Sequence, residues 1–312
     1  MKKIKLEKPT SGSQLVLETL KNLGVEIIFG YPGGAMLPLY DAIHSFEGIK
    51  HILARHEQGA THEAEGYAKS SGKVGVVVVT SGPGATNAVT GIADAYLDSV
   101  PLLIFTGQVG RQSIGKDAFQ EADTVGITAP ITKYNYQIRD TADIPRIVTE
   151  AYYLAQTGRP VEIDLPKDVS TLEVTEINDP TLNLPHYSPT ETASNHQLEK
   201  LLTKLSVSKR PVIIAGGGIN YSDSVSEFRE FVEKYRIPVV STLLGLGTLP
   251  IDHELQLGMA GMHGSYAANM ALVKADYIIN FGSRFDDRVV SNPLKLQSLL
   301  ILILTLPNLE KS

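Results

Sequence analysis

The sequence predicts an α/β protein built from two successive doubly wound parallel-sheet domains. Short β-branched apolar runs alternate with helix-length amphipathic segments, once before and once after a polar stretch near the middle of the chain. Most of the runs are continuous apolar stretches, which indicates strands that helices cover on both faces. The length of 312 residues agrees with roughly two domains.

The first domain is expected over residues 9–172. Its predicted strands are Val25–Gly30, Ile49–Ala54, Val74–Thr80, Pro101–Thr106 and Pro160–Leu165. Helical patterns lie between these strands, at Gln14–Leu23, Gly59–Ser70, Thr86–Leu97 and Asp143–Gln156.

Residues 173–194 are rich in Thr, Asn, Pro and Ser and show little periodicity, which predicts an interdomain linker. A second α/β pattern follows over residues 195–293. Its predicted strands are Pro211–Ala215, Ile237–Ser241 and Asp276–Phe281, with helices at Ser222–Tyr235 and Ser265–Lys274. This second domain is expected to be incomplete, ending one or two strands early.

Composition excludes several classes of function. A net charge of -6 provides no basic surface for nucleic acid, and the absence of cysteine excludes disulfides, thiolate metal sites and a cysteine nucleophile. The basic, polar start lacks the apolar core of a secretory signal, and no stretch in the first 290 residues suits a membrane span. A cytoplasmic location is therefore expected.

The first motif is Arg55-His56-Glu57-Gln58, where the second predicted strand gives way to a helix. Ligands of open α/β sheets gather at such strand ends. A carboxylate there can simply favour the helix start through the macrodipole, or it can be a partly buried acid held for proton transfer. The residue by itself favours the first interpretation.

The second motif, Thr80 to Asn87, reads Thr-Ser-Gly-Pro-Gly-Ala-Thr-Asn and again joins a strand to a helix. Its two glycines permit a tight turn and close backbone approach. The spacing differs from the dinucleotide fingerprint, so a plain strand-to-helix turn is an equally good interpretation.

These motifs follow a Gly30-Tyr31-Pro32-Gly33-Gly34 turn, and the three in this order resemble the pyrimidine-binding domain of thiamine-diphosphate enzymes. The resemblance implies that Glu57 is catalytic: it hydrogen-bonds a ring nitrogen of the aminopyrimidine and favours the imino tautomer, which removes the thiazolium proton. The implied contacts with thiamine diphosphate are Glu57, Pro83, Asn87 and Gln120.

Later segments are similar to the acetohydroxyacid synthase family: Asp117–Asp123, Gly261–Gly264 and Gly282–Arg288. The resemblance implies that Arg288 binds the carboxylate of the second 2-keto acid, because a planar guanidinium can do so bidentately. The further implied substrate residues are Phe119, Lys167 and Met262. The alternatives are a surface ion-pair cluster for Arg288, core packing for Phe119 and Met262, and a solvated loop for Lys167.

The same resemblance implies a structural FAD in the second domain. The glycine turn after Pro211–Ala215 is by itself only a weak dinucleotide signal. The implied FAD contacts are Arg159, Gly216, Gly217, Gly218, Thr242, Leu243, His263, Gly264, Arg284 and Asp286.

The sequence departs from the family in two places. A Gly-Pro pair is missing after Pro160, which would shorten the turn at Arg159 and draw it away from the flavin. After Pro293 the resemblance ceases, and residues 294–312 form an aberrant apolar tail that suits an aggregation-prone strand. Codons that encode this tail can be chosen so that a one-base shift reads Asp-Ile-Asp-Ile-Asp-Pro-Ala-Glu-Phe-Gly-Lys. This is similar to the family segment His-Ile-Asp-Ile-Asp-Pro-Ala-Glu-Ile-Gly-Lys.

We therefore predict a frameshift and the loss of the third, diphosphate-binding domain. The Mg²⁺ ligands that this domain supplies are lost with it. No metal ligand is expected in the chain itself.

The family activity implied is the thiamine-diphosphate-dependent condensation of pyruvate with pyruvate or 2-ketobutyrate, in the synthesis of valine, leucine and isoleucine. The resemblance also implies a homo-oligomer (dimer or tetramer) and a small regulatory subunit as partners. This chain alone is expected to be inactive. The alternative is a non-catalytic FAD- or nucleotide-binding α/β module.

Overall fold

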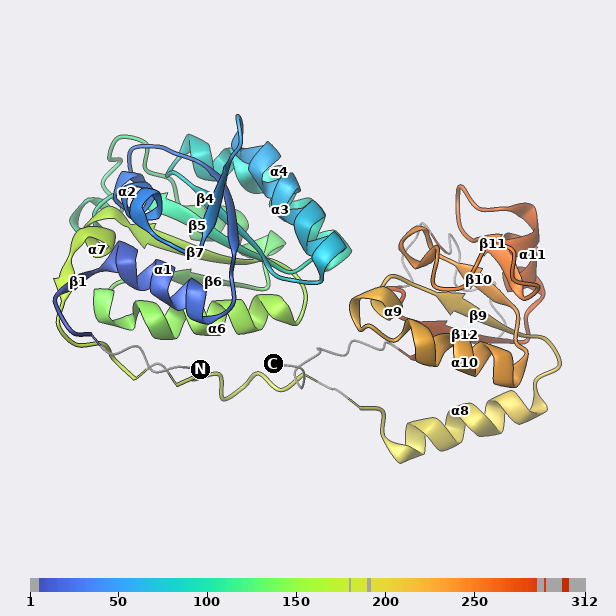
Figure 1. Cartoon of the computed structure of the whole chain (residues 1–312). Helices are drawn as coiled ribbons and strands as arrows, with labels where there is room; N and C mark the ends of the chain where they lie inside the picture. The colour runs from blue at the N-terminus through green and yellow to red at the C-terminus, as the bar shows by residue number, and fades with distance from the viewer. Residues whose placement is uncertain (1–5, 180, 190–191, 285–288, 290–298, 303–312) are drawn as a thin grey trace. The chain divides into compact units, whose positions relative to one another are not determined.

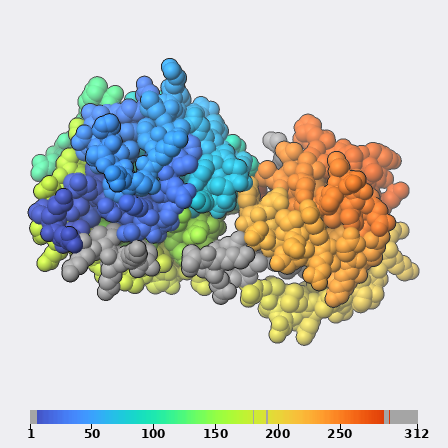
Figure 2. Space-filling view, in the orientation of Figure 1, coloured from blue at the N-terminus to red at the C-terminus, as the bar shows by residue number. Residues whose placement is uncertain are grey.

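The computed structural model describes residues 6–179, 181–189, 192–284, 289 and 299–302 (Figure 1). The chain divides into two compact units, Met1–Tyr187 and Ser188–Ser312. Each unit has its own sheet and its own hydrophobic core. Within each unit, side chains fill the space between the ribbons (Figure 2). In the part of the chain described, no helix is both long and apolar enough to cross a bilayer.

The first unit contains a six-stranded sheet in the order β3-β2-β4-β5-β7-β6, in which every neighbouring pair is parallel. Its strands are β2 (Ile27–Tyr31), β3 (Lys50–Leu53), β4 (Gly75–Val79), β5 (Leu102–Gln108), β6 (Tyr134–Gln137) and β7 (Val161–Pro166). A small antiparallel pair, β1 (Thr10–Ser11) with β8 (Glu173–Val174), lies outside this sheet.

Helices cover both faces of the sheet (Figure 1). One face packs against α1 (Gly12–Asn22), α2 (Leu37–Ser45) and α6 (Ile144–Gln156), and the other against α3 (Glu57–Ser71) and α4 (Pro83–Asp98). The α3 and α4 face is built from alanines such as Ala60, Ala64 and Ala88, which let the helices approach the sheet closely. Two short helices, α5 (Thr124–Thr128) and α7 (Lys167–Thr171), complete this unit.

The second unit contains a five-stranded parallel sheet in the order β11-β10-β9-β12-β13. Its strands are β9 (Pro211–Ala215), β10 (Val239–Ser241), β11 (Gln256–Met259), β12 (Tyr277–Phe281) and β13 (Leu299–Leu302). One core includes α8 (Asn195–Val207), α9 (Gly218–Tyr221) and α10 (Val225–Tyr235), and the other includes α11 (Tyr266–Lys274).

The predicted fold class is confirmed, because both sheets are parallel and helices cover both faces of each. The structure adds β6, β11 and α2, which the sequence did not predict. Part of the apolar tail forms β13, with Leu299 opposite Ile278 of β12. The rest of the tail, residues 303–312, lies outside the described residues, as do residues 294–298.

Candidate functional site

Glu57 lies where β3 gives way to α3, at the carboxyl end of the parallel sheet. The helix starts here because His56 caps it: Nδ1 of His56 accepts the backbone N–H of Gln58 at 3.1 Å. Glu57 is the first residue of the helix and is only 7% exposed. A carboxylate at a helix N-terminus is stabilised by the macrodipole, which offsets part of the cost of burying it.

Asn87, one turn into α4, holds one oxygen of this carboxylate. Its Nδ2 donates to Glu57 Oε2 at 3.0 Å. The other oxygen, Oε1, lies beside Gly84, where a Cβ would stand 3.3 Å from it and 2.6 Å from Thr80 Cγ2. The glycine therefore leaves space beside the free side of the carboxylate.

The Pro-Gly-Gly turn after β2 meets the turn after β4 at the same edge of the sheet. Thr80 Oγ1 accepts the backbone N–H of Ala35 at 3.3 Å, and a Cβ at Gly33 would stand 2.5 Å from Thr80 Cβ. Because β3, β2 and β4 are neighbours in the sheet, the three sequence motifs come together around Glu57.

Tyr40 was not predicted as a site residue. Its hydroxyl donates to the carbonyl of Val78 at 2.7 Å, and burial together with the charge of Glu57 raises the pKa of Tyr40 above its usual range. The phenol therefore stays neutral beside the carboxylate. A tyrosine on an amphipathic helix carries no sequence signal for such a role.

The segment between β5 and α5 lies against the turn before α4. A Cβ at Gly82, whose φ is +52°, would collide with the backbone of Gln120. This contact brings Gln120 next to Pro83, and both side chains are exposed. Phe119 is 87% exposed, so core packing is the wrong interpretation for this residue.

Lys167 begins α7 and is exposed. The next residue, Asp168, accepts from the Nε of Arg111 at 2.8 Å and from its backbone N–H at 3.0 Å. This ion pair fastens the start of the Gln120 segment to the end of β7. Phe119, Gln120 and Lys167 thus all follow strands at the same edge of the sheet as Glu57.

The predicted FAD contacts of the second unit follow β9, β10, β11 and β12, at the carboxyl edge of its sheet. Gly218 N–H donates to Gly282 O at 2.9 Å, and a Cβ at Gly218 would stand 2.7 Å from Gly282 Cα. Thr242 N–H donates to Ala215 O at 2.8 Å. The glycines therefore let the turns after β9 and β12 pack directly on each other.

The remaining predicted FAD residues of this unit lie at the same edge: Gly216, Gly217, Leu243, His263, Gly264 and Arg284. Asn269 of α11, which the sequence did not predict, holds the segment that contains His263. The backbone N–H of Gly261 donates to Asn269 Oδ1 at 2.8 Å, and Asn269 Nδ2 donates to Gly261 O at 3.0 Å. Met262 is 70% exposed, so it is not a core residue. Asp286 and Arg288 lie outside the described residues.

Arg159 lies in the first unit, in the turn before β7. Its φ is +77°, a conformation that a non-glycine residue rarely adopts. Its guanidinium stacks on Tyr96 of α4, with Cζ 4.5 Å from the ring centroid, and donates to the Tyr96 hydroxyl at 3.1 Å. The side chain is thus engaged within its own unit.

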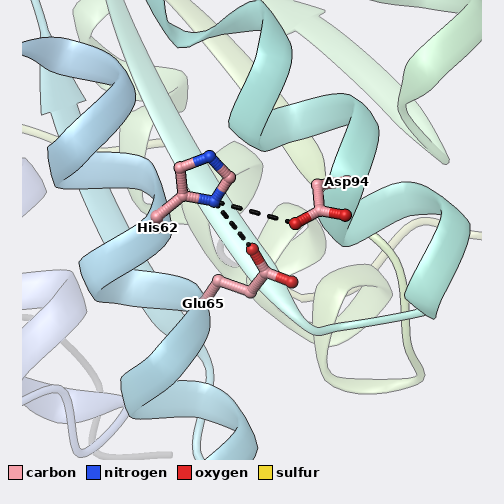
Figure 3. Close-up of side chains that lie close together, drawn as sticks. All are labelled: His62, Glu65 and Asp94. Atoms are coloured by element: carbon pink, nitrogen blue, oxygen red, sulfur yellow. Dashed lines mark hydrogen bonds and ion pairs between the residues drawn. The ribbon is translucent and has the colours of Figure 1, made fainter. Parts of the chain in front are cut away.

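His62, Glu65 and Asp94 form a cluster of possible metal ligands between α3 and α4 (Figure 3). His62 Nδ1 is 3.1 Å from Glu65 Oε2 and 3.7 Å from Asp94 Oδ2. The ammonium of Lys69 lies 2.8 Å from Glu65 Oε1 and 3.0 Å from Asp98. A cation of the chain already neutralises the buried glutamate, so we interpret the cluster as an ion-pair network between two helices.

A buried carboxylate at a strand end, an amide that fixes one of its oxygens and glycine turns around it lie at the carboxyl edge of a parallel sheet, where open α/β sheets bind ligands. Two family models match the chain: the thiamine pyrophosphate enzyme N-terminal TPP binding domain over residues 10–127, and the thiamine pyrophosphate enzyme central domain over residues 198–303. Together they span more than half of the chain, which therefore belongs to the thiamine pyrophosphate enzyme family.

Curated relatives narrow this class. The chain is 89% identical over 297 residues to the acetolactate synthase large subunit of Lactococcus lactis. The aligned region covers 95% of this chain and 52% of that protein. It is 50% identical over 286 residues to the acetolactate synthase large subunit of Buchnera aphidicola, and the aligned region covers 90% of this chain and 50% of that protein. It is 47% identical over 289 residues to the acetolactate synthase isozyme 3 large subunit of Escherichia coli, and the aligned region covers 91% of this chain and 50% of that protein. The chain spans about half the length of these relatives.

Proposed function

We propose that this chain carries the pyrimidine-binding and central parts of an acetolactate synthase catalytic subunit, a transferase. The activity would be the condensation of pyruvate with pyruvate or 2-ketobutyrate with loss of carbon dioxide, in branched-chain amino-acid synthesis. The observation that carries the proposal is the buried Glu57, with Asn87 on one oxygen and Gly84 beside the other, in a chain 89% identical to a relative of that name.

Bound thiamine diphosphate would supply the electron sink for the decarboxylation of a 2-keto acid. Glu57 would share a proton with a ring nitrogen of the aminopyrimidine, through the oxygen that Asn87 leaves open. The macrodipole of α3 and the hydrogen bond from Asn87 would keep the carboxyl in place for this transfer. The neutral Tyr40 adds no competing charge.

The substrate residues proposed are Phe119, Lys167, Met262 and Arg288, of which the first two lie at the same sheet edge as Glu57. Exposure of Phe119 and Met262 suits residues that contact a ligand rather than a core. The proposal also includes FAD at the carboxyl edge of the second unit and Mg²⁺ with the diphosphate. It further includes assembly into an oligomer with a small regulatory subunit, and a cytoplasmic location. The domain boundaries predicted from the sequence, 9–172 and 195–293, stay a prediction.

A chimera tests the proposal. Residues 1–293 of this chain replace the matching part of the Lactococcus lactis relative, and a second chimera restores Gly-Pro after Pro160. Acetolactate is then measured with pyruvate, thiamine diphosphate, Mg²⁺ and FAD. We expect turnover, at least with Gly-Pro restored. If neither chimera turned over while the relative itself did, the proposal would fail.

The alternative, a non-catalytic FAD- or nucleotide-binding module, is not favoured by the relatives. It would gain support if both chimeras bound FAD without any turnover.

A further inference from the structure

Two carboxylates on β7, Glu162 and Asp164, are fully buried on the face of the sheet next to α5. Their alternation with Val161, Ile163 and Leu165 turns the apolar side chains to the opposite face, where they join the core with α1 and α6. In the described part of the chain, neither carboxylate forms an ion pair. Two uncompensated charges at neighbouring positions of one buried strand face would be very costly.

Asp164 has the surroundings of an ionised carboxylate. Its Oδ2 accepts from Gln137 Nε2 at 3.0 Å and from Gln108 Nε2 at 3.2 Å, and its Oδ1 lies 3.2 Å from Thr106 Oγ1. Three donors aimed at one carboxyl group favour its charged form.

Glu162 has different surroundings. Its Oε2 accepts from Asn135 Nδ2 at 3.0 Å, and its Oε1 lies 2.6 Å from the same Thr106 Oγ1. A threonine hydroxyl has one proton and cannot donate to both carboxyl groups. A proton on Glu162 Oε1 removes the conflict: Glu162 donates to Thr106, and Thr106 donates to Asp164.

Other groups around the pair agree with this arrangement. The strands on either side, β5 and β6, contribute only Thr106, Gln108, Asn135 and Gln137, none of which is charged. From the α5 side the charged group is Asp123. Burial, and to a smaller extent the charge of Asp123, raise the pKa of Asp164 to about 6, so this carboxyl group is still ionised at pH 7. Burial, and then the charge of Asp164, raise the pKa of Glu162.

We propose that Glu162 and Asp164 hold a single proton between them, with Glu162 as neutral donor and Asp164 as charged acceptor, and that this pair positions the segment between β5 and α5. Gln108 provides the link. Its Nε2, which donates to Asp164, also donates to Ala122 O at 3.0 Å, while its Oε1 accepts from Val109 N–H at 2.9 Å.

One side chain thus holds both ends of residues 109–122, and Asp164 orients that side chain. Glu162 and Asp164 are positioning residues for the segment that carries Phe119 and Gln120. The relevance of that segment to substrate rests on the proposed function, whereas the shared proton does not.

Infrared spectroscopy of residues 1–312 tests the shared proton, through the carbonyl band of a protonated carboxyl group at pH 7. Glu162→Gln keeps the shape and the donor, and we expect one such band to disappear in the difference spectrum against the unaltered chain. The control is Glu150→Gln, since Glu150 is equally buried but paired with Arg146 at 3.2 Å. An unchanged band in Glu162→Gln, or an equal loss in the control, would overturn the proposal.

Limited trypsin digestion tests the positioning, at Arg111 and Lys116. Asp164→Asn and Gln108→Leu should each speed cleavage there about tenfold, because a hydrogen bond to a charged group is lost. Glu162→Gln should leave the rate unchanged. Cleavage at Lys69 of α3 and Arg146 of α6, which lie in the same unit as the substitutions, shows whether a variant is folded. The positioning role would be refuted if neither Asp164→Asn nor Gln108→Leu were cleaved faster at Arg111 and Lys116 than the unaltered chain. Neither measurement needs a cofactor, so a failure here is distinct from a failure of the proposed function.

Discussion

The side-chain amide of Asn87 donates to Glu57 Oε2 at 3.0 Å, across the junction of two helices that start 26 residues apart in sequence. Both helices begin at the carboxyl edge of the sheet, which is why the two motifs meet. The contact leaves Glu57 Oε1 as the oxygen that can face a ligand.

Gly84→Ala should weaken binding of thiamine diphosphate in an active chimera by about tenfold or more. The new methyl group would stand 2.6 Å from Thr80 Cγ2 and 3.3 Å from Glu57 Oε1, and such overpacking costs about 1–3 kcal/mol. Titration of activity with cofactor measures the effect. Gly66→Ala is the control, because it lies in α3 with open space around it and should stabilise the helix by roughly 1 kcal/mol. Equal cofactor affinity in both variants would contradict the proposed pocket.

The free energy of unfolding of the first unit should fall as pH rises from about 4.5 to about 8. The unfolded chain releases the Glu162 proton near its ordinary pKa of 4.5, whereas burial and the charge of Asp164 raise the folded pKa to about 8. Between these values folding takes up a proton, so stability falls by up to about 1.4 kcal/mol per pH unit.

Hydrogen exchange of peptides from β5 and β7 at several pH values measures this dependence. Glu162→Gln should flatten it and be more stable than the unaltered chain at pH 8. An equally steep fall in that variant would rule out Glu162 as the source.

A fragment of residues 1–172 should be less stable than one of residues 1–187. The shorter fragment loses β8, the partner of β1, and the partly buried side chains that pack on the first core, Val174, Ile177, Leu184 and Tyr187. It also loses the 2.5 Å contact between Tyr187 and Thr157. We expect a melting temperature lower by several degrees, since about 1 kcal/mol shifts it by roughly 2–4 °C in a domain of this size. Equal melting temperatures would favour the sequence-based boundary at residue 172.

The sequence predicted β4 and β9 well because these strands are apolar throughout, as buried parallel strands are. It missed β6, an edge strand whose residues Tyr134 to Gln137 are polar or aromatic and only partly buried. It also missed α2, because the Pro-Gly-Gly turn and Pro38 next to it obscure the helical pattern.

The candidate site was predictable only in part. The order of the motifs identified Glu57, but nothing in the sequence indicates which oxygen Asn87 takes or that Tyr40 lies close by. The alternation in β7 would ordinarily indicate a solvent face for Glu162 and Asp164. That face is instead buried next to α5, and only the tertiary structure reveals the pair.

The most direct test of the central claim compares the turnover of the active chimera with that of the same chimera carrying Glu57→Gln. The substitution keeps the shape and the hydrogen bond site but removes the acid, and turnover of pyruvate to acetolactate is measured at saturating cofactor. Glu63→Gln is the control, since Glu63 lies in the same helix and is exposed. We predict that turnover falls by about 10²–10⁴-fold in Glu57→Gln and stays unchanged in the control. Unchanged turnover in Glu57→Gln would contradict the account.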